Sequence, residues 1–416
     1  MRSILLYLFV IVYSKALFAE VETRKDSIRE AVYSVGKLEE KEVSLSNSFE
    51  NMFIQGTVSG QVRVAYANYN FKNTDPDVYA TAAGGILKYE LAQFKGFNAG
   101  VAFYASKDIA WLSGKGDRRN TELSSSDGEH TDMGEVYVNY QYENLNLRAG
   151  RQILDTPLAD SDDIRMIQNT FEAYIATYNL QGFNFTAGNI QAWHGTDAGL
   201  DDGWQDIGDK GVNVVGVTYA EGLEFQAWYY NMSDLANAFY IDGGGEFAIN
   251  DDISIHAMVQ YLDENELSHS GYGATIYGAL CEVVIQDLGL NVAYNHLDSD
   301  TAKESFSGTG GGALFTNMDM MIMDNISVDR DVDAIVAGFV YNHENFSFLY
   351  AYGDFSGEKD SLGDKAHVVE QDISLEYNVN DEFLIALIYV LSEDKQSTTK
   401  TEYDYDRAQL MVNYNF

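Results

Sequence analysis

The sequence is poor in proline, cysteine and basic residues. Its 416 residues include only 2 prolines and 1 cysteine, and 26 Lys+Arg stand against 64 Asp+Glu. Because proline is excluded from the interior of sheets, its scarcity permits long uninterrupted strands. The single cysteine, Cys281, excludes an intrachain disulfide. The formal net charge of -38 argues against nucleic acid as a partner, since phosphate binding needs a basic surface.

Long apolar runs are also missing. Beyond the N-terminus, no stretch approaches the roughly 18 consecutive apolar residues that a spanning helix requires. The mean hydropathy of -0.23 would suit a soluble protein. A transmembrane barrel gives the same average, however, because its strands alternate apolar and polar residues. Aromatic residues are abundant, with 29 Tyr and 22 Phe, and they favour strands and membrane interfaces.

The N-terminal fifty residues differ from the rest of the chain. A basic start, an apolar run and a small-residue stretch ending at Ala19 predict a secretory signal peptide over residues 1–19. Residues 20–50 are charged and carry apolar residues at helical spacing. They predict a periplasmic extension that is either a short helix or a mobile segment. A barrel domain is expected over residues 51–416.

From Ile54 the sequence alternates with a period of two. Every second residue from Ile54 to Tyr66 is apolar or glycine, and the residues between them, up to Arg63, are polar. Such alternation predicts a strand, and its length suits a tilted membrane strand of roughly 9–11 residues. The pattern recurs to the end of the chain and predicts about eighteen strands. They are expected at 54–66, 79–91, 97–107, 133–143, 145–151, 170–179, 183–191, 212–220, 223–231, 239–248, 253–261, 272–284, 288–296, 332–342, 346–355, 366–378, 383–392 and 405–416.

Short and long connections are expected to alternate strictly between these segments. The short ones, such as "LQG", "AEG" and "HEN", hold the Gly or Asn of tight hairpins. The long ones are polar and acidic, at 108–132, 152–169, 192–211, 297–331, 356–365 and 393–404. Sorting by length is typical of outer-membrane barrels, which have short periplasmic turns and long extracellular loops. The expected fold class is therefore all-β, a transmembrane antiparallel β-barrel.

The last strand carries a further sign of an outer-membrane barrel. Apolar residues share one face of 405–416, and Arg407 and Gln409 share the other. The chain ends on Phe416. A terminal aromatic residue on an alternating strand resembles the insertion signal of such barrels, so the barrel-assembly machinery is an expected partner of this strand.

A barrel of this size predicts a channel. A sheet that spans hydrocarbon must close, and about eighteen strands enclose more space than side chains can fill. The expected function is an outer-membrane porin for passive diffusion of ions and small hydrophilic solutes. The alternative is a structural or adhesion barrel that anchors the outer membrane, with transport incidental. The inward-facing polar set includes an expected basic row of Arg63, Lys88, Arg148, Arg151 and Arg407.

The loop at about 152–169 is the candidate constriction. It contains Pro157 and a compact mixture of charges, and its length suits a loop folded into the lumen. The candidate constriction residues are Asp155, Asp160, Asp162, Asp163 and Arg165. Within the lumen they would face the basic row and set up a transverse field. An external acidic loop is the other interpretation.

This segment resembles the OprD-type family of substrate-preferring porins, in particular a campylobacter-like branch. The matching residues are Gly150, Arg151, Gln152, Asp155, Thr156, Pro157, Leu158, Asp162, Asp163, Arg165, Met166, Asn169, Thr170, Phe171 and Glu172. The resemblance implies that this loop constricts the pore and that the basic row guides anionic, often carboxylate-bearing solutes. Gln168 stands where a proline commonly occurs, and the basic row is thin, so no particular solute is predicted.

Enzymatic and metal-binding patterns are not evident. The seven His have no metal-ligand spacing, and no nucleophile elbow occurs. A rim hydrolase would need a pair such as His130 with Asp132. We expect no enzyme activity and no cofactor, although the acidic loops are candidates for weak Ca²⁺ binding. Expected partners are outer-membrane lipid, lipopolysaccharide and small solutes, with a homotrimer or a monomer as the assembly.

Overall fold

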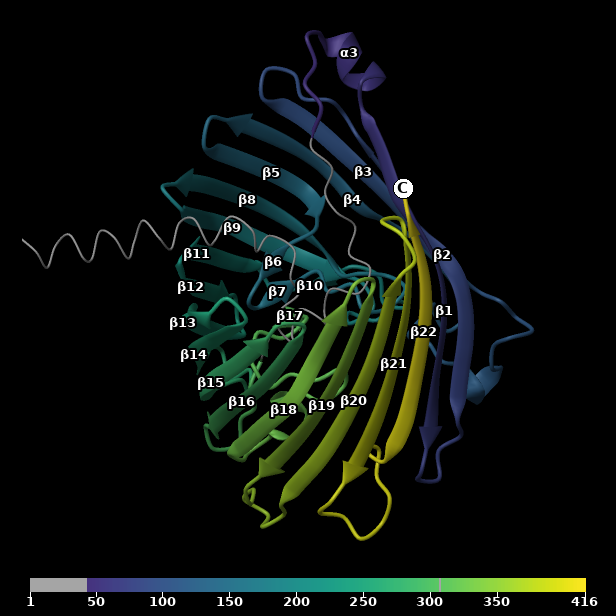
Figure 1. The fold of residues 1–416 in the computed structure, drawn as a ribbon, viewed down its shortest axis with the longest axis vertical. Helices are drawn as coiled ribbons and strands as arrows, with labels where there is room; N and C mark the ends of the chain where they lie inside the picture. The colour runs from purple at the N-terminus through teal and green to yellow at the C-terminus, as the bar shows by residue number, and fades with distance from the viewer. Residues whose placement is uncertain (1–42, 307) are drawn as a thin grey trace, which may run out of the picture.

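The structure is a computed structural model that describes residues 43–306 and 308–416. Eighteen long strands form one closed antiparallel barrel (Figure 1). The barrel closes because β22 (Tyr405–Asn415) pairs with β1 (Thr57–Phe71), which places Arg63 beside Asn413. Closure gives every strand two neighbours and leaves no unpaired edge in hydrocarbon. The all-β barrel predicted from the alternation is confirmed.

Each long strand pairs with the next one along the chain, and all eighteen predicted strands correspond to observed ones. The strands between β1 and β22 are β2 (Val78–Glu90), β3 (Phe97–Asp108), β4 (Glu129–Tyr142), β5 (Leu145–Gln152), β8 (Thr170–Leu180), β9 (Phe183–His194), β11 (Val212–Glu221), β12 (Leu223–Met232), β13 (Ala236–Asn250), β14 (Ile253–Glu266), β15 (Ala274–Ile285), β16 (Leu288–Ser299), β18 (Val332–His343), β19 (Phe346–Gly357), β20 (Ala366–Asn378) and β21 (Phe383–Asp394). The two-residue strand β10 (Gln205–Asp206) also pairs with β9.

The start of the first strand differs from the prediction. A short helix, α3 (Phe49–Ile54), occupies the residues just before β1, and its N-terminus is capped by Ser48. The side-chain oxygen of Ser48 accepts the backbone N–H of Asn51 at 3.1 Å, which satisfies a donor that the helix leaves free. Ile54 therefore belongs to the helix rather than to the strand. The predicted signal peptide and most of the predicted extension lie outside the described residues.

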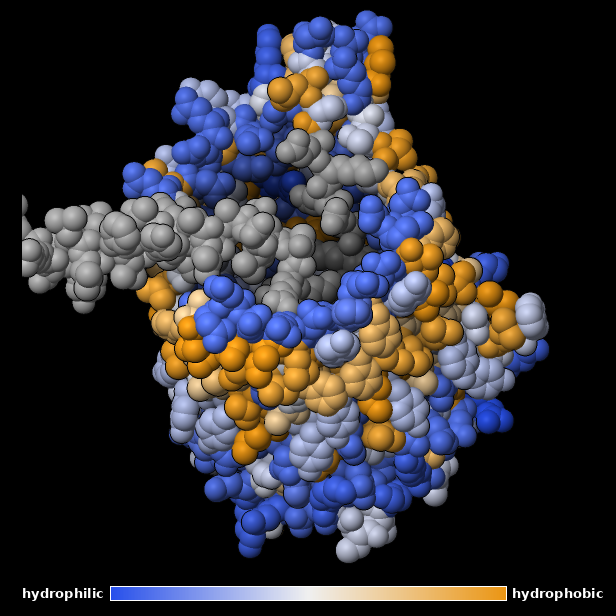
Figure 2. Space-filling view, viewed as in Figure 1, coloured by the Kyte–Doolittle hydropathy of each residue, from blue (hydrophilic) through white to orange (hydrophobic). Residues whose placement is uncertain are grey.

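Side chains alternate between lipid and lumen as the sequence pattern predicts. On β1, Val62 and Val64 are exposed on the outside, whereas Arg63 between them is buried inside. Figure 2 shows the result as an apolar band between hydrophilic zones. Exposed aromatic residues such as Tyr277 and Phe346 contribute to the outer surface near strand ends, where their amphipathic rings suit the membrane interface.

The connections follow the predicted sorting with one clear exception. Tight turns such as Gln181–Gly182 join strands at one end, and both of these residues adopt positive φ (50° and 80°). That geometry matches the twist of a hairpin and favours glycine. Loops at the other end are mostly longer, but the connection 233–235 between β12 and β13 is short. Alternation of loop length is therefore not strict.

Two long loops enter the barrel and build a small sheet there. Loop 153–169 forms a hairpin of β6 (Asp155–Thr156) and β7 (Ala159–Asp160), and β17 (Thr309–Gly310) of loop 300–331 pairs parallel to β7. Figure 1 shows these strands within the ring of long strands. The buried side chains of both loops form one core with the wall, so the lumen has a packed interior of its own. That core includes Leu158, Leu314, Met318, Met321 and Phe171.

Candidate channel constriction

Loop 300–331 is fixed to the barrel wall by two carboxylates of β20. Glu370 Oε1 accepts the backbone N–H groups of Met320 and Met321 at 2.9 and 3.1 Å. Asp372 Oδ2 accepts the N–H of Asp319 at 3.0 Å. These three hydrogen bonds tie three consecutive backbone N–H groups of the loop to one strand. They hold this part of the loop against the wall of the lumen.

Arg63 of β1 fastens loop 153–169 to the barrel wall. It is fully buried (0% exposed), and its Nη1 and Nη2 donate to the two oxygens of Asp163 at 2.8 and 2.9 Å. Its Nε donates to Asn413 Oδ1 at 2.7 Å, and its Nη1 also contacts the carbonyl of Arg165. The bidentate ion pair fixes both the distance and the orientation of the loop.

Two further arginines share two carboxylates beside this pair. Asp319 lies 3.3 Å from Arg165 and 3.0 Å from Arg407, measured between Oδ1 and Nη1 and between Oδ2 and Nη1. Glu122 Oε1 lies 3.6 Å from Arg165 Nε, and Oε2 lies 3.3 Å from Arg407 Nη2. We call these four side chains the junction cluster. Two guanidinium groups face two carboxylates, so the ionised cluster is neutral.

The members of the junction cluster come from different parts of the chain. Glu122 belongs to loop 109–128, which also holds the 3-10 helix η2 (Gly116–Arg118). Arg165 and Asp319 belong to loops 153–169 and 300–331, and Arg407 stands on β22. The cluster therefore joins three loops to the wall at one place in the lumen. Loops joined to the wall in this way fill part of the cross-section of the barrel.

The two kinds of carboxyl group in these loops differ in their ionisation. Burial alone would raise the pKa of Glu122, but the guanidinium groups of Arg407 and Arg165 lower it to about 2. Glu122 is thus ionised at any pH near neutrality. Burial raises the pKa of Asp162 well above its usual range, and the charge of Asp197 raises it further. The charge of Arg165 offsets only part of this rise in pKa, and Asp162 forms no ion pair with the side chains of residues 43–306 and 308–416.

The other expected members of the basic row lie at different places in the lumen. Lys88 Nζ donates to Glu135 at 2.8 Å on the neighbouring part of the wall. The guanidinium carbon of Arg148 lies 4.5 Å from the centre of the Tyr137 ring, a cation–π contact. Lys88 on β2 and Arg148 on β5 face the lumen, as Arg63 does.

Two expected constriction residues lie away from the junction cluster. Asp155 of β6 lines a lumen cavity of about 320 Å³ together with Arg148, Thr177 and Trp228. Asp160 lies in β7 next to Gly310 of β17. The structure thus brings Asp163 and Arg165 to the arginine-rich part of the lumen and leaves Asp155 in a separate cavity.

Arg151 does not lie with the basic row. It pairs with Val136, an outward-facing residue, so it stands on the opposite face of β5 from Arg148. Its guanidinium carbon lies 4.2 Å from the centre of the Trp204 ring, and Nη1 is 3.9 Å from Asp132. The physical reason is the period of the strand, because positions 148 and 151 are an odd number of residues apart and face opposite ways.

The wall of the lumen is asymmetric in charge. Strands β13 to β20 contain no lysine or arginine, whereas the inward-facing cations stand on β1, β2, β5 and β22. The buried acidic residues on strands β13 to β20 are Asp242, Glu264, Glu282, Glu370, Asp372 and Glu376. The wall from β13 to β20 is therefore acidic beneath its surface, whereas the basic side is largely occupied by ion pairs.

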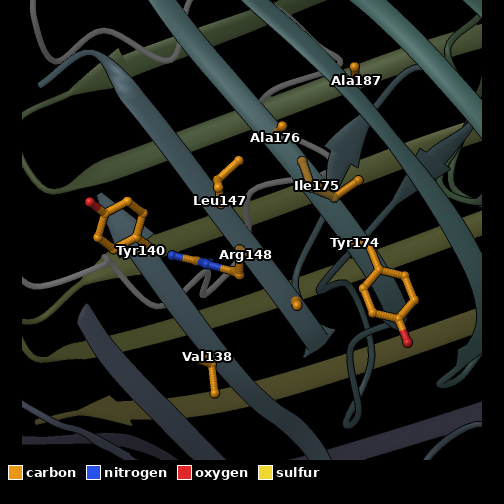
Figure 3. Close-up of a pocket in the computed structure, with 9 residues that line it drawn as sticks. Val138, Tyr140, Leu147, Arg148, Tyr174, Ile175, Ala176 and Ala187 are labelled. Atoms are coloured by element: carbon orange, nitrogen blue, oxygen red, sulfur yellow. The ribbon is translucent and has the colours of Figure 1, made fainter. Parts of the chain in front are cut away.

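A second cavity, of about 370 Å³, belongs to the outer surface rather than to the channel. Figure 3 shows it between Tyr140 and Tyr174, over β4, β5 and β8. Most of its lining is apolar, and Val138, Leu147 and Tyr174 are exposed on the outside of the barrel. Such a groove faces hydrocarbon in a membrane and is not a site for hydrophilic solutes.

Glu122 and Asp319 were not singled out from the sequence, although both lie in loops recognised as long. The sequence feature that indicates packing of these two loops inside the barrel is their content of apolar residues. Leu123, Leu314 and Phe315 are buried, and apolar side chains inside a polar loop indicate packing against something. No such signal identifies the partner of each charge, because ion pairs between distant loops have no spacing in the sequence.

Neither a metal site nor a spanning helix was found in the described part of the chain. Over residues 43–306 and 308–416, no three His, Cys, Asp or Glu side chains are placed to hold a metal ion. Within the same residues, no helix has both the length and the apolar character needed to cross a membrane.

Comparisons with known proteins agree with this architecture. The family model described as outer membrane porin, OprD family, matches residues 51–416. OpdK of Pseudomonas aeruginosa, solved with vanillate, superposes with a TM-score of 0.75 at 18% identity, over 88% of this chain and 99% of that one. OccAB2 of Acinetobacter baumannii gives 0.74 at 15% identity, with 88% and 99% covered. A BenF-like porin of Pseudomonas fluorescens gives 0.74 at 16% identity, again with 88% and 99% covered.

A search of curated protein sequences found no match. At these identities the solved structures establish a shared fold and nothing more. The closed barrel, its charged lumen and its inward loops define an outer-membrane diffusion channel rather than an enzyme. The chain belongs to the OprD family of outer membrane porins, as the match over residues 51–416 shows. It is thus an integral outer-membrane channel for passive diffusion of small solutes.

Proposed function

We propose that the channel is narrowest at the junction cluster and the adjacent Arg63–Asp163 pair. One wall of the constriction is loop 153–169, with Asp162, Asp163 and Arg165, and the other wall is loop 300–331. The observation that carries this proposal is the burial of Arg63 and Arg407, both 0% exposed although they face the lumen. Loops cover these side chains, so a solute has to pass beside the loops. Asp155 and Asp160 would then line the approach.

The charge at this constriction favours cations and neutral solutes over anions. Three guanidinium groups, those of Arg63, Arg165 and Arg407, are balanced by three carboxylates in direct ion pairs. The strands from β13 to β20 add acidic side chains and contain no lysine or arginine. OpdK was solved with vanillate, but the basic row of this chain offers little uncompensated positive charge to a carboxylate. Solutes are therefore small and hydrophilic, with anions the least favoured.

Single-channel recording tests the proposal. The protein without residues 1–19 is refolded in detergent and inserted into a planar bilayer with a KCl gradient across it. We expect discrete conductance steps and a reversal potential of cation-selective sign. A correctly folded barrel that never conducts would contradict an open channel, and a reversal potential of anion-selective sign would contradict the charge argument.

Several partners follow from the same reasoning and remain proposals. The outer surface is matched to membrane lipid and, at the loop end, to lipopolysaccharide. Phe416 hydrogen-bonds through its backbone to Gly60, and it ends the strand that the barrel-assembly machinery would read. Residues 1–19 would be removed as a signal peptide, and residues 20–50 would extend into the periplasm. A homotrimer is tested by the mass of the protein in native membranes or mild detergent.

A further inference from the structure

Glu122 reaches the lumen on a loop that is held in place by its neighbours. Asn120 Oδ1 accepts the N–H of Glu122 at 2.8 Å, and Asn120 Nδ2 donates to Glu122 Oε2 at 3.2 Å. The Tyr69 hydroxyl donates to Glu122 Oε1 at 2.9 Å. The next residue, Leu123, is completely buried and packs in a core cluster with Met166. The carboxylate therefore has a fixed position rather than a range of loop conformations.

The charge of Glu122 decides the electrical balance of the junction cluster. Arg165 and Arg407 carry two positive charges and share the two carboxylates of Glu122 and Asp319. Loss of one carboxylate charge leaves one guanidinium charge without compensation. Since the cluster lies among buried side chains, salt screens that charge less than it would screen one on an open surface.

We propose that Glu122 is a specificity-determining residue, which neutralises the arginines at the constriction and so prevents the channel from favouring anions. With Glu122 in place, the lumen presents no net positive charge to a passing ion, and small cations and neutral solutes pass in preference. Charge in a narrow passage sets the local concentration of counter-ions, so a single residue there has a large effect on selectivity. This inference rests on the proposed function of the same constriction.

The test is Glu122→Gln, which keeps the shape of the side chain and removes its charge. In a KCl gradient we expect the channel to conduct still, with a cation-to-anion permeability ratio roughly tenfold lower than that of the wild-type protein. Asp117→Asn is the matched control, because Asp117 is an exposed acidic residue of the same loop. This control should leave the ratio unchanged. Conduction by Glu122→Gln at the wild-type ratio would overturn the inference.

Two further variants separate charge from structure. Glu122→Asp keeps the charge and should keep the wild-type sign of selectivity, whereas a shift as large as that of the Gln variant would assign Glu122 a purely structural role. If Glu122→Gln does not refold, Glu122→Cys in a Cys281→Ser background takes its place. A negatively charged thiol reagent should then restore cation preference and a positively charged one should reverse it, and equal effects of both would refute the inference.

The inference and the proposed function fail in different ways. Absence of conductance in the wild-type protein removes the channel itself. Normal conductance of the wild-type protein, together with unchanged selectivity in Glu122→Gln, leaves the channel intact and removes only the role of Glu122.

Discussion

Neighbouring carboxyl groups in loop 153–169 have opposite effects on stability. Asp163 forms a bidentate ion pair with Arg63, so its charge is compensated. Asp162 is buried, its Oδ1 lacks a hydrogen-bond partner among the described residues, and burial and Asp197 both raise its pKa. A buried carboxylate without compensation is costly. Asp163 therefore fastens the loop, whereas the ionised form of Asp162 strains it.

We expect Asp162→Asn to stabilise the barrel near neutral pH. The pKa of Asp162 is higher in the folded than in the unfolded protein, so folding is penalised once the pH rises above the unfolded value of about 4. Replacement by the neutral amide should recover about 1–3 kcal/mol at pH 7.5. The gain should vanish as the pH falls below about 4, where the carboxyl is neutral in both states.

The measurement is the midpoint of thermal unfolding at pH 4 and at pH 7.5. The shift in gel mobility between the folded and the unfolded barrel reports the fraction unfolded at each temperature. Asp202→Asn, an exposed position in loop 195–211, is the control and should change neither midpoint. An equal midpoint for Asp162→Asn and the wild-type protein at pH 7.5 would show that the buried carboxyl causes no strain.

Residue positions could be predicted from the sequence where a strand determines them. Arg63 and Arg407 were placed in the lumen by alternation, and both face it. The same rule places Arg151 on the opposite face from Arg148, because the two residues are three positions apart on one strand. Partners such as Asp319 could not be predicted, because nothing in a sequence relates charges in separate loops.

At the scale of elements, the strands could be predicted and the paths of the loops could not. Periodicity located all eighteen long strands, because each one has to present apolar side chains to lipid. Loop 297–331 was recognised only as long and acidic. Its entry into the barrel depends on tertiary contacts with Glu370, Asp372 and Gln260. Helix α3 was missed because it is short and joins the alternating segment directly.

Removal of residues 313–326 from loop 300–331 should enlarge the channel. This segment contributes buried side chains to the core of the lumen and includes η3 (Met323–Ile326). Without it we expect a several-fold rise in single-channel conductance and a weaker dependence on solute size in liposome swelling. A shortening of the exposed loop 72–77 between β1 and β2 should leave both unchanged. Unaltered conductance after the deletion would show that loop 300–331 does not limit the passage.

At the scale of the whole molecule, assembly depends on the last strand. β22 pairs with both β21 and β1, so it completes the ring. We expect Phe416→Ser to lower the amount of folded protein in outer membranes several-fold, because the terminal aromatic residue is the proposed insertion signal. The amount of folded protein is measured on gels as the band of the unheated sample that shifts after heating. Phe383→Ser, an outward aromatic substitution on β21 next to Tyr414, controls for the loss of an aromatic residue at the interface.

Closure of the ring also determines when, during its synthesis and export, the chain can complete the barrel. The hydrogen bond from Arg63 to Asn413 joins residues 350 positions apart, so the seam forms only after nearly the whole polypeptide has been made and exported. A chain released early by the ribosome would have two open edges and no way to satisfy them in hydrocarbon. Only a chain that reaches β22 can therefore form a sealed channel, because no earlier strand pairs with the free edge of β1.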